Sequence, residues 1–191
     1  VTEGDKGFSV PASHVTLRDF TVQRNYYGVF FESNQFSVAE RMFIRSNYYG
    51  IINNSTRSIT NRNIRLWNNI MGGIDIYNAR TTVVENCDFV LNPNYGCRVR
   101  SSVNNILQNN IFYVSGTNSW ALAGDAAVVD SAFIDYNIYY LEQTSSIFAT
   151  YRDLIPWQLT YGNDFRSSIT NPLYANPAAG DFHPKSLGGR Y

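Results

Sequence analysis

An asparagine recurs in this sequence at a nearly constant interval. Asn25, Asn47, Asn69, Asn92 and Ser115 are separated by 22, 22, 23 and 23 residues, and most of them stand shortly before a glycine and an aliphatic residue. A period of this length is typical of solenoids, because each repeat forms one turn that buries its apolar face only by stacking on its neighbours. The repeat therefore predicts similar turns stacked one upon another.

A second polar register lies six residues earlier in each repeat. It consists of Asp19, Arg41, Asn63, Asn86 and Asn109. Two apolar columns share the period, one with Phe20, Met42, Ile64 and Cys87 and the other with Val22, Ile44, Leu66, Phe89 and Phe112. The fifth repeat slips at Asn110, which leaves its register defined to within one residue. We expect the asparagines to hydrogen-bond to the backbone and to one another inside the turns, which is a structural role.

Three short β-type runs make up each repeat. In the first complete repeat they are Val15–Leu17, Phe20–Val22 and Val29–Phe31. Helices fit this pattern poorly, because the β-branched and aromatic runs have four residues or fewer and are interrupted by Asn and Gly. The sequence therefore predicts an all-β fold, a single-stranded right-handed parallel β-helix of about five or six coils.

The repeats weaken toward the C-terminus. We predict one domain over residues 1–191, with coils in 1–140 and an irregular cap in 141–191. The last coil is expected to use Val128 and Val129 as a strand. Within the cap, residues 151–159 favour a short helix whose Trp157 packs onto the last coil, and the tail after it is rich in Pro, Gly and Asn. Repeat stacks need ends of this kind, which stop further strand pairing.

The charge balance argues against charged partners. The chain has 15 basic and 15 acidic residues and no net charge. Nothing in it attracts nucleic acid or an anionic membrane surface, and no run approaches the roughly 20 apolar residues of a membrane span. The sequence begins at Val1 without Met or a leader, and we interpret it as an excised mature segment. We therefore expect no nucleic-acid partner and no membrane partner.

The two cysteines are too few for a disulfide framework. Cys87 and Cys97 both fall at inward positions of one coil. We expect two small buried thiols rather than a bridge.

The C-terminal part carries motifs that are found together in one group of proteins. They are Trp157-Gln158, Gly162-Asn163-Asp164, Ser167-Ser168, Asn171-Pro172-Leu173-Tyr174 and the stretch from Asn176 to His183. This pattern resembles the C-terminal stretch of extracellular bacterial right-handed β-helix proteins of the pectate-lyase-like superfamily. That superfamily includes polysaccharide lyases, glycoside hydrolases, epimerases and non-catalytic modules, so the resemblance is specific for fold and weak for function.

A narrower resemblance follows from the small number of coils. Superfamily enzymes usually have more coils and an N-terminal capping helix, whereas this chain looks most like the family-89 carbohydrate-binding modules attached to xylanases. That resemblance implies a secreted protein that binds xylan.

The resemblance also implies where a ligand lies, which is over the third run of each repeat and beside the loop leading into it. Carbohydrate-binding residues predicted on this face are Tyr27, Tyr49, Asp75, Tyr77, Tyr95, Arg98, Arg100 and Trp120. Sugars are held by aromatic rings against the pyranose face and by planar polar groups that bind hydroxyls. Two alternatives remain open: the tyrosines could stack on one another to cover the core, and the arginines could simply pair with Asp75.

A second candidate face lies outside the middle run. Its residues are Phe43, Arg45, Arg65, Trp67 and Tyr113. It is also aromatic and basic, and it ranks second because ligands of the superfamily use the other side.

Catalytic groups are less well represented than binding groups. A lyase needs a base, for which Arg98 or Arg100 is suitable, and commonly a calcium ion held by several acids. A glycosidase needs carboxylates roughly 5 to 9.5 Å apart, and Asp75 and Glu32 stand in different columns two coils apart. We predict no catalytic residue, no metal site and no cofactor, although a structural calcium ion without a predicted position remains an option.

These observations favour a non-catalytic module that binds plant cell-wall polysaccharide, a xylan-like β-glycan, for a secreted multidomain glycoside hydrolase. Its partners would be the polysaccharide and the catalytic domain of the same parent chain. Two alternatives remain, a catalytic fragment of a β-helix lyase or hydrolase that uses Arg98 or Asp75, and a structural spacer or adhesin.

Overall fold

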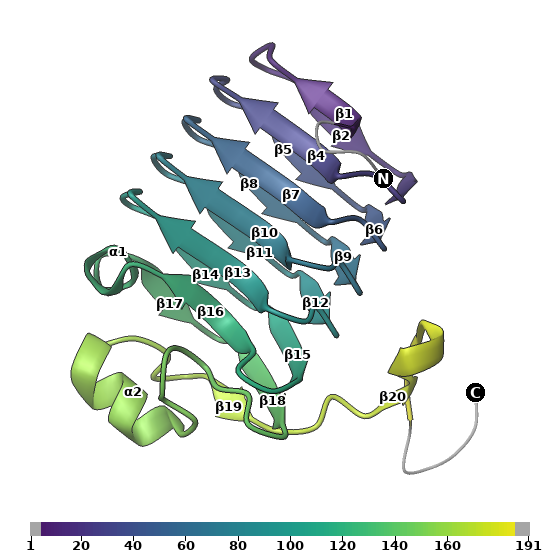
Figure 1. Ribbon diagram of the computed structural model, residues 1–191. Helices are drawn as coiled ribbons and strands as arrows, with labels where there is room; N and C mark the ends of the chain where they lie inside the picture. Colours follow the sequence, from purple (N-terminus) through teal and green to yellow (C-terminus); the bar gives the residue numbers. More distant parts are fainter. Residues whose placement is uncertain (1–4, 186–191) are drawn as a thin grey trace.

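A computed structural model describes residues 5–185 and consists of parallel strands stacked into a solenoid (Figure 1). The extreme ends of the predicted coil and cap regions, residues 1–4 and 186–191, lie outside the described residues. Sheet A contains β1 (Lys6–Val10), β4 (Tyr27–Glu32), β7 (Tyr49–Asn54), β10 (Gly72–Tyr77), β13 (Tyr95–Arg100) and β16 (Trp120–Gly124). These strands come from the third predicted run of each repeat.

The first and second predicted runs form two further parallel sheets. Sheet B contains β2 (Thr16–Arg18), β5 (Val38–Glu40), β8 (Thr60–Arg62), β11 (Val83–Glu85), β14 (Ile106–Gln108) and β17 (Phe133–Asp135). Sheet C contains β3 (Thr21–Gln23), β6 (Phe43–Arg45), β9 (Arg65–Trp67), β12 (Asp88–Val90), β15 (Ile111–Ser115), β18 (Ile138–Glu142) and β19 (Ser168–Ile169). The predicted parallel arrangement with three strands per coil is therefore confirmed.

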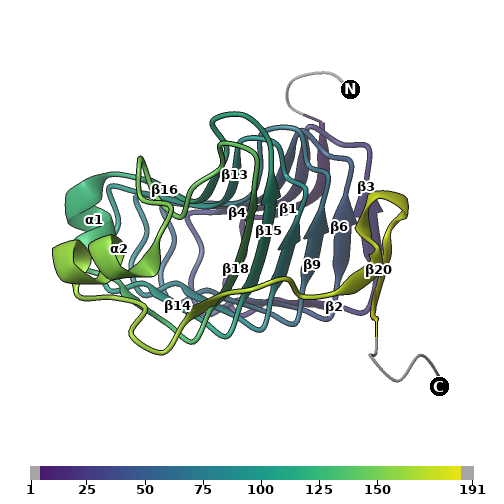
Figure 2. The ribbon, with the colours of Figure 1, turned by 90° about the horizontal axis from the view of Figure 1, so that it is seen from below.

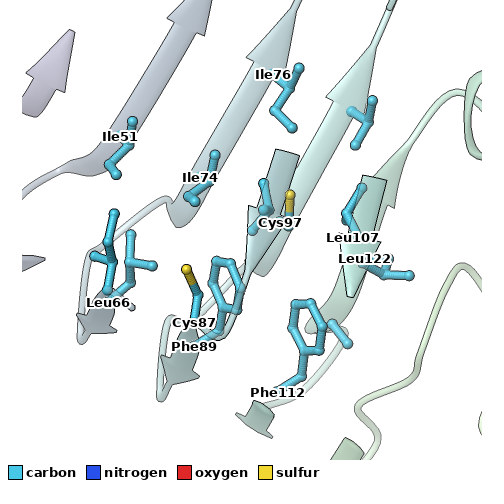
Figure 3. Packing of buried hydrophobic residues seen from close by; sticks show 14 of the residues in the cluster. Ile51, Leu66, Ile74, Ile76, Cys87, Phe89, Cys97, Leu107, Phe112 and Leu122 are labelled. Carbon is cyan, nitrogen blue, oxygen red and sulfur yellow. The ribbon is translucent and has the colours of Figure 1, made fainter. Parts of the chain in front are cut away.

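The core lies inside the coils and is built from the predicted apolar columns (Figure 3). One column of buried residues occupies the same strand position in four successive coils, and it consists of Ile44, Leu66, Phe89 and Phe112. The rings of Phe89 and Phe112 stack with centroids 4.7 Å apart. Like residues meet at this spacing because neighbouring strands of a sheet are about 4.8 Å apart.

The first asparagine register forms a buried ladder at the corner between sheets C and A. The Oδ1 atom of Asn69 accepts the backbone N–H of Asn47 at 3.2 Å, and its Nδ2 atom donates to the carbonyl of Ile44 at 3.1 Å. The next coil repeats the pattern, since the N–H of Asn69 donates to Asn92 at 2.9 Å. The structural role predicted for these asparagines is confirmed. Ser115 is the exception, because it lies at the end of β15 and pairs with Glu142.

The second register turns the chain between sheets B and C. Its residues adopt left-handed backbone with φ of 64° at Asp19, 50° at Arg41, 54° at Asn63, 52° at Asn86 and 56° at Asn109. Asparagine and aspartate tolerate this conformation better than most residues, because their short side chains can hydrogen-bond locally. The register thus marks the tight turn that lets two residues join two sheets.

The last coil departs from the sequence prediction. Val128 and Val129 were expected to form a strand, but they lie in the short helix α1 (Ala126–Asp130), which connects sheet A to sheet B in place of the usual turn. The alanines that begin this segment favour helix, and one turn of it directs Val129 into the core. The strand prediction for these two residues was therefore wrong.

A helix covers the C-terminal end of the core, as predicted. It is α2 (Leu154–Tyr161), and its Trp157 is fully buried. The helix ends at Gly162 in left-handed conformation, with φ of 66°. Asp164 follows and is buried, and its carboxylate accepts hydrogen bonds from Nε1 of Trp157 at 2.7 Å and from the hydroxyl of Tyr139 at 2.8 Å. The Gly-Asn-Asp motif thus fastens the cap to the last coil.

The tail after β19 folds back along the outside of sheet C (Figures 1 and 2). It forms a small hairpin of β20 (Tyr174–Asn176) and β21 (Asp181–Pro184), with the 3₁₀ turn η1 (Pro177–Ala179) between them. Part of the predicted cap is therefore a cover for one face rather than for the end of the solenoid.

Both cysteines are buried and unbridged, as predicted. Burial raises the pKa of Cys87 to about 12, so this thiol is not a nucleophile at neutral pH. Among the described residues, no helix is both long and apolar enough to cross a membrane.

The ladder predicts opposite effects for one substitution at two buried asparagines. Asn69→Val removes a side chain with protein partners on both polar atoms, and we expect it to lower the free energy of unfolding by about 3 kcal/mol. Asn53 lies between Phe31 and Ile76 in sheet A, and within residues 5–185 neither of its side-chain polar atoms has a hydrogen-bond partner. Asn53→Val should raise the free energy of unfolding by about 1 kcal/mol.

Urea denaturation of both variants measures the difference. Equal destabilisation by the two substitutions would contradict the structural role assigned to the ladder.

Candidate functional site

The outer face of sheet A carries two columns of side chains in register. Phe30, Ile52, Asp75 and Arg98 form the first column on β4, β7, β10 and β13. Glu32, Asn54, Tyr77 and Arg100 form the second column at the ends of the same strands. Because adjacent strands are about 4.8 Å apart, each column presents its groups at nearly equal steps along the solenoid.

Between these columns lies a shallow groove with a volume of about 260 Å³. We call it the sheet A groove. Its lining residues are Tyr27, Phe30, Tyr49, Ile52, Asn54, Asp75, Tyr77, Arg98 and Arg100. Six of the eight residues predicted to bind carbohydrate are in this set, so the structure brings most of the predicted face together in one groove.

Asp75 stands at the polar end of the groove and holds two arginines. Its side chain is buried, and its Oδ2 atom accepts hydrogen bonds from Nη2 of Arg98 and, at 2.9 Å, from Nη2 of Arg100. The pairing that the sequence left open is thus present. The Oδ1 atom of Asp75 and the Nε atoms of both arginines have no hydrogen-bond partner among the described residues. All three atoms are buried, so the exposed parts of the two arginine side chains are what faces the groove.

A cluster of four tyrosines borders the other end of the groove. The rings of Tyr26 and Tyr48 stack with centroids 4.7 Å apart, and those of Tyr27 and Tyr49 stack at 5.6 Å. Edge-to-face contacts at 4.7 and 5.1 Å join the two layers. The alternative of mutual stacking is therefore realised, although all four rings remain half-buried. Tyr27 and Tyr49 begin strands β4 and β7 rather than lying in the preceding loops.

Tyr95 was expected to stack on a sugar, but the structure buries it. Its side chain is 3% exposed, and burial raises the pKa of its hydroxyl above the usual value. The cause is Gly72, which occupies the tyrosine position of the neighbouring coil. A Cβ atom at Gly72 would lie 2.1 Å from the Tyr95 ring, so the missing side chain leaves room for that ring. Tyr95 instead supports Arg98, whose guanidinium carbon lies 4.5 Å from the ring centroid.

Tyr77 is the most accessible ring of the groove. It is 43% exposed, and the guanidinium of Arg100 lies 4.8 Å from its centroid. Trp120, in contrast, lies outside the groove in a separate hollow of about 190 Å³ beside Phe148. Its indole N–H donates to the carbonyl of Ala149 at 3.1 Å. Trp120 therefore packs against the start of the cap.

The second candidate face is covered by the tail. Phe182 makes an edge-to-face contact with Trp67 at 5.8 Å and another with Phe43 at 6.2 Å. The guanidinium of Arg65 lies 4.5 Å from the Phe182 ring, and Tyr174 packs against Tyr113. These aromatic residues form a small second core. The expectation of a free binding surface on this face was wrong, because sequence spacing does not reveal that the tail returns.

Arg45 remains at the edge of the covered face. Its Nε atom donates to Gln23 at 2.8 Å, and its guanidinium lies 5.3 Å from the Phe43 ring. It therefore supports the same aromatic cluster.

A larger hollow of about 700 Å³ lies at the corner between sheets B and C. The charges there are already paired, since Arg41 donates two hydrogen bonds of 2.7 Å to the carboxylate of Asp19. Within residues 5–185, no group of three or more His, Cys, Asp or Glu side chains is placed to hold a metal ion.

Comparison with known proteins concerns the fold. A family model described as a right handed beta helix region matches residues 6–149. The structure of a double mutant of the periplasmic alginate epimerase AlgG is similar over 87% of this chain and 45% of its own, with a TM-score of 0.58 and 14% identity. An alginate lyase from Paenibacillus sp. str. FPU-7 is similar over 86% of this chain and 75% of its own, with a TM-score of 0.44 and 12% identity. No curated protein matches the sequence.

These similarities confirm the predicted right-handed β-helix. They do not support the narrower resemblance to family-89 xylan-binding modules. The chain spans less than half of the length of the alginate epimerase. At this level of identity the likeness establishes the fold alone.

The geometry of Asp75 leads to a prediction about stability. Asp75→Asn leaves two partly buried guanidinium groups without their counter-ion, and we expect it to lower the free energy of unfolding by about 2 kcal/mol. Asp19→Asn is the matched control, because Asp19 also binds an arginine but at the exposed surface, where ion pairs contribute little. Chemical denaturation should separate the two variants, and equal stabilities would contradict the role given to Asp75.

Proposed function

This chain belongs to the right-handed β-helix family, and on that premise we propose that it is a non-catalytic module that binds polysaccharide in the sheet A groove. The observation that carries the proposal is the convergence in one groove of stacked tyrosines, an exposed Tyr77 and the Asp75–Arg98–Arg100 cluster. A pyranose ring needs an apolar face and several hydroxyl partners at once. The groove offers both within one volume.

The aromatic part of the groove gives the apolar face. Tyr27 and Tyr49 present adjacent stacked rings at one end, and Tyr77 stands at the other side with much of its ring accessible. Tyrosine combines an apolar ring with a polar tip, which suits a wet binding surface. Because the rings already contact their neighbours, little conformational entropy is lost when a sugar stacks on them.

The polar part of the groove gives directional contacts. Arg98 and Arg100 are held in place by Asp75, and their side chains stay 22% and 37% exposed at the groove. A guanidinium fixed by a carboxylate is a planar donor of known orientation, which suits recognition of vicinal hydroxyls. Asn54 adds an amide on the same side of the groove.

Pairing of Asp75 favours binding over cleavage. A general base or nucleophile must be free to take a proton or attack carbon, whereas Asp75 is buried between two guanidinium groups. The alternative is a lyase or hydrolase in which Arg98 or Asp75 takes part in the chemistry. It has support from the buried Tyr95 hydroxyl beside Arg98, which has no hydrogen-bond partner among the described side chains. A structural spacer or adhesin is the third alternative, and it predicts neither binding nor turnover.

We further propose that the ligand is a plant cell-wall glycan of the xylan type and that the module serves the catalytic domain of a longer parent chain. The neutral balance of 15 basic and 15 acidic residues supports a neutral or lightly substituted polymer over a polyuronate. We propose an extracellular or periplasmic location, which agrees with the periplasmic origin of the similar alginate epimerase. The proposal requires no cofactor, no nucleic acid and no membrane.

Tyr77→Ala tests the aromatic part of the groove. We expect it to weaken retention of the protein in gels that contain xylan about fivefold, because losing one aromatic stacking contact costs about 1 kcal/mol. Tyr136→Ala is the matched control. Tyr136 is also 43% exposed and also carries an arginine on its ring, Arg166 at 5.0 Å, but it lies at the end of sheet B. Equal retention of the two variants would argue against the sheet A groove.

Turnover distinguishes binding from catalysis. We expect the protein to be retained by xylan. We also expect it to release no reducing ends from xylan, mixed-linkage glucan, pectin or alginate, and to cause no rise in absorbance at ~235 nm, which reports β-elimination. Product formation from any of these polymers would establish the catalytic alternative. In that case Asp75→Asn and an Arg98→Lys variant become the tests of mechanism.

A further inference from the structure

Two arginines stand side by side at the corner between sheets A and B. Arg57 and Arg80 belong to consecutive coils and are joined by an isolated parallel bridge, which also links Gln35 before them and Val103 after them. They belong to the segments that follow β7 and β10 in the chain, and Figure 1 shows these segments as part of a row of turns beyond the arrowheads. Their backbones are therefore about 4.8 Å apart, and both side chains are exposed.

Neither arginine has an acidic partner among residues 5–185. Most other arginines in this part of the chain lie within 4.0 Å of a carboxylate, namely Arg18, Arg41, Arg62, Arg65, Arg98, Arg100 and Arg166. Arg57 and Arg80 thus place two uncompensated positive charges next to each other in a protein with no net charge. Like charges on neighbouring coils repel each other, and an anion bound between them reduces the repulsion.

The corner also provides a lined cavity. Its volume is about 340 Å³, and hydroxyl and amide side chains line it together with the two arginines, among them Ser55, Asn78 and Ser101. The Nδ2 atom of Asn78 donates to the hydroxyl of Ser55 at 3.1 Å, which fixes both groups. A volume of this size lies within the range of roughly 300–1,000 Å³ that is typical of small-ligand sites.

Backbone geometry holds the arginines outward. In the coil of Arg57 the flanking residues Ser55 and Ser58 both have a φ of 54°, and in the coil of Arg80 the flanking residues Asn78 and Thr81 have φ of 49° and 59°. Each arginine thus has one left-handed residue before it and one after it, which makes the chain turn sharply there. The same turn occurs in both coils. The two guanidinium groups are therefore presented on one ridge.

The carboxylates near this ridge are engaged elsewhere. Asp125 accepts the backbone N–H of Ser101 at 3.0 Å at one end of the cavity, and Glu32 pairs with Lys6 at 3.8 Å toward the other. Neither forms an ion pair with Arg57 or Arg80. The ridge thus keeps its positive charge.

The cavity adjoins the sheet A groove. Asn54 lines the groove and the next residue, Ser55, lines the corner cavity, with 3.4 Å between the Ser55 hydroxyl and Oδ1 of Asn54. In the next coil Tyr77 and Asn78 are related in the same way. A side group on a glycan chain held in the groove therefore needs to pass only one row of residues to reach the arginines.

We propose that Arg57 and Arg80 form a second subsite that binds carboxylate side groups of a polysaccharide whose backbone lies in the sheet A groove. This inference rests on the proposed function and adds the ligand's chemistry, a neutral backbone with acidic branches. Guanidinium groups bind carboxylates through paired N–H donors, and the serine and asparagine side chains bind the neighbouring hydroxyls. Because the two arginines are one coil apart, two acidic branches on nearby sugars of the polysaccharide can each bind one arginine.

A pair of polymers and a pair of double variants test the subsite. The polymers are glucuronoxylan and the same preparation after reduction of its carboxyl groups to alcohols. The variants are Arg57→Gln/Arg80→Gln and the control Arg18→Gln/Arg152→Gln, which changes the net charge equally at exposed arginines outside the corner cavity. Thermal unfolding followed by circular dichroism verifies that both variants fold.

We expect the wild-type protein and the control variant to bind glucuronoxylan about tenfold more tightly than the reduced polymer at low salt, because two guanidinium–carboxylate contacts are lost on reduction. Arg57→Gln/Arg80→Gln should bind both polymers equally, at the level of the reduced one. Salt should weaken binding of the acidic polymer only where the arginines are present.

Other outcomes overturn one proposal or the other. Equal binding of both polymers by the wild-type protein, or an equal loss in both double variants, would overturn the subsite and leave the groove in place. Binding of glucuronoxylan that depends on Arg57 and Arg80 but not on Tyr77, with none of the reduced polymer, would overturn the groove and keep the corner as a carboxylate site. Absence of binding to either polymer would overturn both.

Discussion

The fold depends on hydrogen bonds that close the corner between sheets C and A from one coil to the next. The Oδ1 atoms of Asn47, Asn69 and Asn92 each accept the backbone N–H of the asparagine one coil earlier, and their Nδ2 atoms donate to buried carbonyls. A slip of one residue between coils would bury these groups without partners and would also turn each strand's core face outward. The ladder therefore fixes the register between the neighbouring coils that it joins.

The groove follows from that register. Because β7, β10 and β13 are aligned residue by residue, Asp75 stands directly beside Arg98, and Tyr77 stands beside Arg100. The same alignment places Gly72 beside Tyr95, so the tyrosine ring lies where a side chain at position 72 would be. In this position the ring packs against the guanidinium of Arg98. The register between coils thus decides which side chains are neighbours in the groove. It also places Arg57 beside Arg80 at the border of the groove.

The sequence contains most of this information because the repeat is local. The period identifies the strands, and the spacing of the outward columns is enough to predict that Asp75, Arg98 and Arg100 are neighbours. Burial of Tyr95 could not be inferred, since it depends on a rotamer that fills a void. The cover over Trp67 could not be inferred either, because Phe182 reaches it through long-range packing of the tail. A signal for the corner was present, as Arg57 and Arg80 are one period apart.

The most direct test of the account is to locate the bound glycan on the protein. Titration of isotope-labelled protein with a neutral xylan oligosaccharide, followed by NMR of the arginine Nε–H groups and the backbone amides, reports contact at each residue. We predict shifts at the Nε–H signals of Arg98 and Arg100 and at the amides of β7, β10 and β13, because both arginine side chains line the groove and stay partly exposed there. Shifts confined to sheet C and the tail, or none at saturating oligosaccharide, would contradict the account.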